Sequence, residues 1–184
     1  DADKVFERLT AWWNGEVLDR TNIAVVAPKK GASLKKIPAP ATLEKQWTDI
    51  DYVIEKNFAR MAATAYMGDA LPCMRAELGP NFLAATLGCK LNFLPDTTWA
   101  EPAIADWQSF QGFPDYHASR WYRLTVKMTQ RVAAEAKGRC IAQMPDLHCG
   151  GDAVAALRGN EPFLLDFYDN PDRLRQTLGM VDDI

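Results

Sequence analysis

Apolar residues recur along this chain with two different spacings, one helical and one strand-like. In residues 3–13, Val5, Phe6, Leu9, Trp12 and Trp13 lie at three- and four-residue intervals, which predicts an amphipathic helix. Further helices are predicted over 42–63, 79–88, 119–138, 150–159, 160–169 and from 170 to the end of the sequence. The helix over 119–138 is the clearest, with Ser119 as its cap and an apolar stripe formed by Trp121, Leu124, Met128, Val132 and Ala136. Strands are predicted by β-branched or alternating apolar runs at 22–28, 64–74, 89–102 and 139–148.

Strands separated by helices are typical of an α/β fold with a parallel sheet. We therefore expect one domain over residues 1–184, with about four parallel strands and helices between them. We expect the run at 22–28 to be a buried strand, and the Lys-, Gly- and Pro-rich segment 29–42 to be a loop. The element order fits part of a TIM (β/α)8 barrel or a small open sheet.

Composition narrows the classes of partner. The net charge is −3, and acidic and basic residues are interleaved, so neither nucleic acid nor an anionic membrane is an expected partner. No apolar run approaches the roughly 20 residues that cross a bilayer, and we expect no signal peptide. The four cysteines form no C-x-x-C pair, which favours a reduced, cytoplasmic protein.

The richest group of candidate residues follows the strand predicted at 139–148. Asp146, His148 and Asp152 lie where a strand meets a helix, which is where α/β proteins collect functional groups. His148 could act as a base or a ligand while a carboxylate orients its ring. Alternatively, Asp152 caps the helix, and Gly150 and Gly151 form the turn.

Three other features are candidates for a site. Asp69 follows an apolar run and Gly68, where glycine permits an unusual backbone angle, and Asp69 either faces a pocket or caps a turn. Asp96 and Trp99 lie in a loop after a strand, where turn chemistry is the simpler interpretation. Arg158 could bind a substrate carboxylate or could stabilise the end of its helix. The sequence contains no G-x-G-x-x-G, P-loop, G-x-S-x-G or H-E-x-x-H motif.

Several stretches together resemble the uroporphyrinogen decarboxylase superfamily. The likeness is greatest to its decarboxylase-like and corrinoid-dependent methyltransferase branches. The stretches are FERLTAWWNGEVLDRTNIAVVAP, MGDALPCMRAELGPNFLAATLGCKLNF, DTTWAEPAIADW and DLHCGGDAVAALRGNEPFLLDFYDNPDRLRQTL. The resemblance runs over nearly the whole chain. It implies the N-terminal half of a (β/α)8 barrel, with a pocket at the carboxyl ends of the strands.

The resemblance also implies roles for individual residues. Asp69 matches the central aspartate of the family, and Asp69 and His148 would be catalytic groups that hydrogen-bond a substrate. Six further residues would bind the substrate: Arg20, Lys29, Lys30, Asp146, Asp152 and Arg158. We expect no metal site in this chain, because the zinc ligands of the methyltransferase branch, an H-x-C pair and a later cysteine, are expected in the second half of the barrel.

The resemblance implies two activities for the full-length parent protein, of which this chain would be the N-terminal half. The first is methyl transfer to or from a corrinoid protein, with corrinoid or zinc as cofactor of the full-length parent. The second is decarboxylation of a tetrapyrrole, with Arg20, Lys29 and Lys30 holding carboxylates. In both cases the substrate is a small molecule, either a tetrapyrrole or a methyl donor or acceptor. A third alternative is a non-catalytic binding fragment. Because half a barrel has open sheet edges, we expect a homo-oligomer and little catalysis by the isolated chain.

Overall fold

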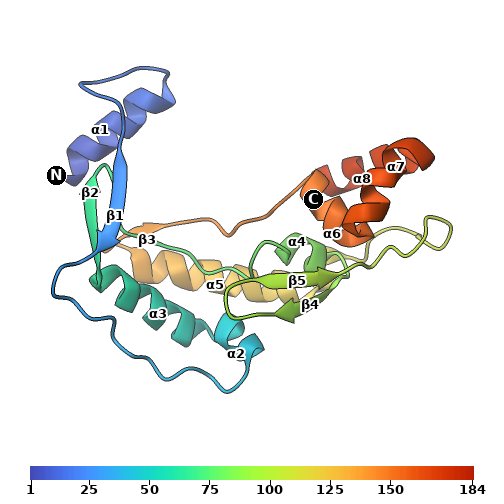
Figure 1. The fold of residues 1–184 in the computed structure, drawn as a ribbon, viewed down its shortest axis with the longest axis horizontal. Helices are drawn as coiled ribbons and strands as arrows, with labels where there is room; N and C mark the ends of the chain where they lie inside the picture. Colours follow the sequence, from blue (N-terminus) through green and yellow to red (C-terminus); the bar gives the residue numbers. More distant parts are fainter.

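The computed structural model describes residues 1–184 and combines eight α-helices with three separate two-stranded sheets (Figure 1). The helices are α1 (Ala2–Trp13), α2 (Leu43–Thr48), α3 (Ile50–Ala62), α4 (Phe82–Thr86), α5 (Arg120–Ala136), α6 (Gly151–Arg158), α7 (Asn160–Asp169) and α8 (Pro171–Asp182). The strands are β1 (Ala24–Pro28), β2 (Thr64–Gly68), β3 (Cys73–Met74), β4 (Lys90–Phe93), β5 (Thr98–Glu101) and β6 (Ile141–Ala142). The expected α/β class is therefore confirmed.

One parallel pair, β3 with β6, joins distant parts of the chain. Cys73 lies opposite Ile141 and Met74 opposite Ala142. The backbone N–H of Ile141 donates to Pro72 O, and that of Gln143 donates to Met74 O, each at 2.9 Å. Parallel strands need a long crossover, which here includes α4, the β4–β5 hairpin and α5. The segments that follow β3 and β6 consequently run onward in the same direction.

The expectation of about four parallel strands is wrong, since only this pair is parallel. β1 with β2 and β4 with β5 are antiparallel. Residues 94–97 are too short a connection for a parallel crossover, so β4 and β5 form a hairpin. No closed barrel is seen.

The prediction of a buried strand at 22–28 is wrong in its burial. β1 is largely exposed along its length. In Figure 1 the β1–β2 ribbon and α1 stand away from the body of the molecule at one end, while α6, α7 and α8 gather at the other. β-Branched residues therefore identified the strand but not what covers it, and nothing packs over most of this ribbon.

Two hydrophobic clusters meet at α4, whose five residues are all buried. One cluster packs the helices α6 and α8 against α4 and the β4–β5 hairpin, and includes Leu83, Ile104, Trp107, Val154, Leu157, Leu174 and Val181. The other packs α3 and α5 against β3, and includes Ile54, Met74, Leu78, Phe82, Trp121, Met128 and Val132. Met74 and Met128 are fully buried, so β3 is fixed by the core on the side facing the helices.

Helix boundaries agree with the predictions to within about two residues, with two exceptions, of which the first is the helix predicted over 79–88, found only over Phe82–Thr86. Ser119 caps α5 by accepting the N–H of Trp121, and Trp121, Met128, Val132 and Ala136 form its buried stripe, as predicted. The single helix predicted over 42–63 is instead two, α2 and α3. Asp49 interrupts them in an extended conformation and caps α3 by accepting the N–H of Tyr52.

No helix in the structure has the length and apolarity needed to cross a bilayer. The exposed apolar residues of α1, among them Trp12 and Trp13, lie on a helix of 12 residues that also carries charged side chains.

Candidate functional site

His148 lies between two carboxylates in the turn that joins β6 to α6. Its Nε2 atom is 3.1 Å from Asp146 Oδ2, and its Nδ1 atom is 3.8 Å from Asp152 Oδ2. The structure thus brings together the three residues that the sequence grouped at this junction. A carboxylate on one ring nitrogen fixes the orientation of the imidazole and favours one tautomer, leaving the other nitrogen toward a ligand.

The backbone at His148 adopts an unusual conformation. Its φ angle is +40°, and it is the only non-glycine residue in the chain with positive φ. Such a conformation costs of order 1–3 kcal/mol and persists only where surrounding contacts hold it. Gly150 follows at φ +63° and occupies the N-cap of α6. The interpretation of Asp152 as the helix cap is therefore wrong, since Asp152 lies in the first turn and makes no capping bond.

A cleft of about 320 Å³ opens beside His148. Its lining residues come from the segment after β3, from β5 and from α6 and α7: Pro80, Asn81, Trp99, Ala100, Pro102, His148, Asp152, Ala155, Ala156, Gly159 and Asn160. Asp146 is not among them, so it orients His148 from outside the cleft while Asp152 faces into it. The cleft lies beyond the carboxyl ends of β3 and β6, where α/β folds bind ligands.

Asn81 and Asn160 are cleft residues that the sequence did not single out. The side-chain nitrogen of Asn81 donates to Thr98 O at 2.8 Å, which fixes the amide against the hairpin. Asn160 begins α7 directly after Gly159. Both lie within the helices predicted over 79–88 and 160–169, but their meeting at one cleft depends on the tertiary fold.

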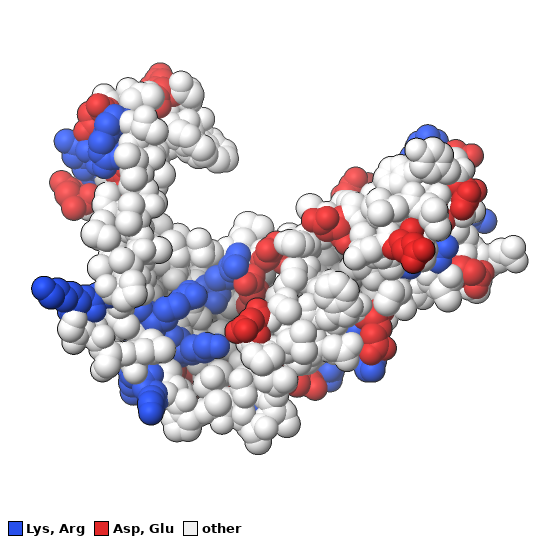
Figure 2. All heavy atoms as spheres, viewed as in Figure 1, with Lys and Arg blue, Asp and Glu red and all other residues white.

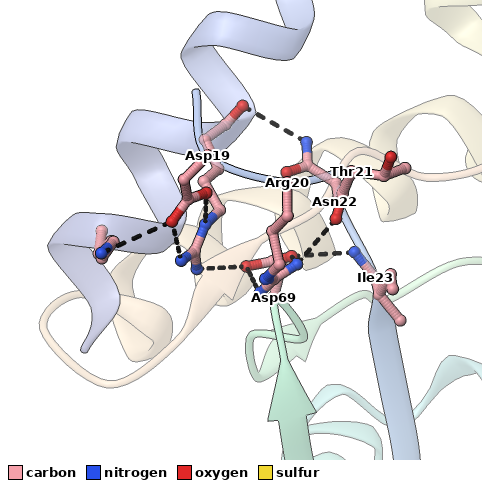
Figure 3. Close-up of polar contacts among 8 residues, drawn as sticks. Asp19, Arg20, Thr21, Asn22, Ile23 and Asp69 are labelled. Atoms are coloured by element: carbon pink, nitrogen blue, oxygen red, sulfur yellow. Dashed lines mark hydrogen bonds and ion pairs between the residues drawn. The ribbon is translucent and has the colours of Figure 1, made fainter. Parts of the chain in front are cut away.

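Asp69 lies in a different place, at the end of β2, where it binds two arginines and a backbone amide (Figure 3). Arg20 donates to both of its carboxylate oxygens, at 2.6 and 2.9 Å, and the N–H of Ile23 donates at 2.9 Å. Arg8 of α1 donates to Oδ1 at 3.0 Å. The side chain of Asp69 is only 1% exposed, and its carboxylate accepts four hydrogen bonds from the protein.

The same cluster extends to Asp19. Arg8 makes two 2.7 Å hydrogen bonds to Asp19 in a bidentate pair, and Lys4 lies 3.6 Å from the same carboxylate. The bonds from Arg8 hold the pKa of Asp19 well below its usual range and raise the pKa of Arg8. The cluster therefore links α1 to the loop after it and to the end of β2.

Asp69 also depends on the glycine before it. Gly68 has φ +64°, and a Cβ atom at that position would collide with Ile23 O. That same carbonyl accepts the N–H of Asp69 at 2.7 Å. The expectation that Gly68 has an unusual backbone angle is confirmed, and the angle permits this close approach.

Lys29 and Lys30 do not join Asp69 and Arg20. Ala24 pairs with Gly68 at one end of the ribbon, and Pro28 pairs with Thr64 at the other. Lys29 and Lys30 follow Pro28, so about 17 Å of strand separates them from Asp69. Both are exposed, and neither makes an ion pair.

Arg158 is a structural residue of the C-terminal helices. Its Nε donates to Asp166 Oδ2 at 2.8 Å, and its Nη1 donates to the carbonyls of Ile104 and Ala105. The two side chains are 13% and 2% exposed. Burial tends to raise the pKa of Asp166, but the nearby donors, Arg158 foremost, outweigh it and lower that pKa. These bonds leave little of Arg158 to receive a substrate.

No group of three or more His, Cys, Asp or Glu side chains is placed to hold a metal ion. The four cysteines are all free thiols. Burial raises the pKa of Cys89 to about 11 and raises that of Cys73, which disfavours the thiolate form that binds metals.

The charge of Asp69 makes stability depend on pH in acid. Its hydrogen bonds from Arg20 and Ile23 hold the folded-state pKa at about 2, below the ordinary value of 3.8. The stabilisation is therefore complete above about pH 4 and is lost as the pH falls toward 2. We expect Asp69→Asn to be less stable than wild type at pH 7. Its free energy of unfolding should also fall less than that of wild type between pH 4 and 2. Urea unfolding at each pH measures the free energy of unfolding, and Asp183→Asn, at an exposed position, is the control. Equal slopes of this free energy against pH in all three proteins would contradict the role of Asp69.

Replacing Arg158 distinguishes a structural arginine from a substrate-binding one. Arg158→Gln leaves Asp166 buried without its ionic partner, so we expect the free energy of unfolding at pH 7 to fall by about 3 kcal/mol. Arg175→Gln, which breaks an exposed pair with Asp172, is the matched control and should cause a much smaller loss. Equal losses in the two variants would show that the Arg158–Asp166 pair does not support the fold.

Comparisons with known proteins identify no family for this chain. No protein-family model, curated protein or solved structure matches the chain.

Proposed function

We propose that the chain forms the small-molecule site of a uroporphyrinogen decarboxylase-like protein that transfers a methyl group to or from a corrinoid protein. In this proposal the parallel strands β3 and β6 carry the site at their carboxyl ends, as the strands of the family's barrel do. The observation that carries it is the position of His148, held between Asp146 and Asp152 at a cleft beyond the carboxyl ends of both strands.

Each residue of the cleft has a role in this proposal. His148 hydrogen-bonds the substrate and exchanges a proton with it through the ring nitrogen on the cleft side, and Asp146 keeps the ring oriented. Asp152 stabilises positive charge on the imidazole when it is protonated. Trp99 supplies an exposed aromatic face, against which a flat or methylated ligand can pack.

The size of the cleft limits what it holds. A volume of about 320 Å³ is at the lower end of the range for ligand pockets. It suits a small methyl donor or acceptor, or one edge of a larger ring. In the proposal a partner protein carries the corrinoid and presents one edge of its ring to the cleft, so free methylcobalamin serves as the probe for that contact. The chain offers no zinc ligands in this proposal, because His148 and Cys149 belong to no metal-binding group.

Methyl transfer is preferred over tetrapyrrole decarboxylation because of the state of Asp69. In the decarboxylase alternative Asp69 stabilises a protonated pyrrole, while Arg20, Lys29 and Lys30 hold carboxylates. Asp69 already accepts four hydrogen bonds, Arg20 is committed to it, and the two lysines lie at the far end of the ribbon. A pyrrole would have to displace these donors before it reached the carboxylate.

The free edges of the β3–β6 pair favour assembly with a second copy of the chain. In the proposal, such a homo-oligomer would cover the edges that the two-stranded sheet leaves unpaired. A non-catalytic binding fragment would use the same cleft without turning over a substrate.

The two histidines of the chain provide a matched test of the cleft. His148→Gln removes the proposed ligand contact, whereas His117→Gln changes an exposed histidine that stacks on Tyr116. The binding of methylcobalamin is followed by its visible absorbance. We expect wild type and His117→Gln to bind it with equal affinity. We expect His148→Gln to bind it about tenfold more weakly, because the variant loses one hydrogen bond to a charged group.

Uroporphyrin serves as the second ligand in the same titration. Tighter binding of uroporphyrin than of methylcobalamin, weakened by Arg20→Gln rather than by His148→Gln, would favour the decarboxylase alternative. Binding of neither ligand, or equal weakening by both histidine variants, would contradict the assignment of His148. Circular dichroism of each variant establishes that it is folded.

A further inference from the structure

A second pocket, of about 340 Å³, is lined by Arg75 and Glu77, the part of the segment after β3 that lies nearer to the strand. It is lined by residues of α2 and α3, of the segments after β3 and β6, and of the β4–β5 turn: Gln46, Trp47, Val53, Lys56, Asn57, Arg60, Arg75, Glu77, Pro95, Asp96 and Gln143. Only two of the eleven are hydrophobic. None of them belongs to the His148 cleft.

Three basic side chains converge on this pocket. Lys56 and Arg60 are four residues apart in α3 and so lie on one face of that helix. Arg75 directly follows β3. Figure 2 shows basic side chains gathered over the region of α3 and the strand segment beside it, with fewer acidic ones next to them.

The acidic residues of the pocket do not neutralise this charge. Arg75 pairs with Glu77, with 2.7 Å between Nη2 and Oε1. Asp96 makes no ion pair with any of the three cations, and neither Lys56 nor Arg60 has a carboxylate within 4 Å. Two cations therefore face a polar pocket without an anionic partner.

The frame of the pocket is fixed by hydrogen bonds. Asn57, which is buried, donates from its side chain to Val53 O at 2.9 Å and to Arg75 O at 3.2 Å, tying α3 to the strand segment. Arg60 donates to Asn57 Oδ1 at 3.2 Å, which holds part of its guanidinium and leaves its other donors toward the pocket. Preorganised donors of this kind cost little ordering entropy when a ligand binds.

We propose that this pocket binds a small oxyanion, that is, the carboxylate or phosphate group of a small molecule. Arg60 supplies a planar donor pair suited to a carboxylate or phosphate, and Lys56 supplies a second positive charge. Gln143, which makes no side-chain hydrogen bond within the protein, offers an amide donor from the segment after β6. The site is separate from the methyl-transfer proposal and does not depend on it.

The pocket and the His148 turn share one link. Glu77 Oε1 accepts from Arg75, and its Oε2 accepts the backbone N–H of Asp146 at 3.2 Å. Asp146 in turn orients His148. An anion that attracts Arg75 would compete with Glu77, so occupation of the pocket is physically connected to the turn that holds the imidazole.

Calorimetric titration with inorganic phosphate and with citrate, at constant ionic strength, tests the oxyanion site. We expect one or both anions to bind wild type, and Arg60→Gln and Lys56→Gln each to weaken binding about tenfold. Arg173→Gln removes the same charge from the exposed face of α8 and should leave the affinity unchanged.

The two probes distinguish the source of the anionic group. Preference for phosphate indicates a phosphorylated ligand, and preference for citrate indicates a carboxylic acid. Arg60→Gln could fail to fold because Asn57 loses its partner. In that case the anion affinity of Lys56→Gln, a change at an exposed position, tests the proposal by itself. No heat of binding up to millimolar anion, or equal weakening by Arg173→Gln, would overturn the proposal.

Discussion

The short parallel pairing of β3 with β6 is the constraint on which both candidate sites depend. Two backbone hydrogen bonds, Ile141 to Pro72 and Gln143 to Met74, bring segments almost 70 residues apart into register. The buried side chains of Met74 and Met128 hold the pair against the helices, so its position is set by the core. The segments beyond it then carry Asn81 and His148 to one cleft and Arg75 and Gln143 to the other pocket.

The Asp69 cluster has a different task, which is to attach the N-terminal helix. Few residues of α1 are buried, and Arg8 is its main polar link to the β1–β2 ribbon through Asp19 and Asp69. A carboxylate with four donors is well stabilised as an anion but has little capacity left for a ligand. The molecule thus uses one buried aspartate for structure, whereas the side chain of His148 is 41% exposed at its cleft.

Local features of the fold were readable from the sequence, and the features that depend on distant contacts were not. The stripe from Trp121 to Ala136 and the cap at Ser119 gave α5 correctly, because both depend on neighbours within the helix. Periodicity identified the apolar side of α1 but not that Trp12 and Trp13 remain exposed. Alternation identified strands but not their pairing direction, which depends on the path of the connections.

The candidate sites show the same division between local features, which the sequence predicted, and distant contacts, which it did not. Asp146, His148 and Asp152 were found together because they are close in sequence. Arg8, Asn81 and Asn160 were missed because their partners lie far along the chain, up to 61 residues for the pair Arg8 and Asp69. Grouping Lys29 and Lys30 with Asp69 failed because an extended strand separates them in space. Side chains that share a role by family resemblance need not meet in the fold.

The central claim is that the β3–β6 pair places His148 at a ligand-binding cleft. Nitrogen-15 NMR of histidine-labelled protein tests it most directly, because the chain has only two histidines and each gives its own ring signals. Addition of methylcobalamin should shift the ring nitrogens of His148 and leave those of His117 in place. Unchanged His148 signals at ligand concentrations that shift His117, or shifts of neither histidine, would contradict the claim.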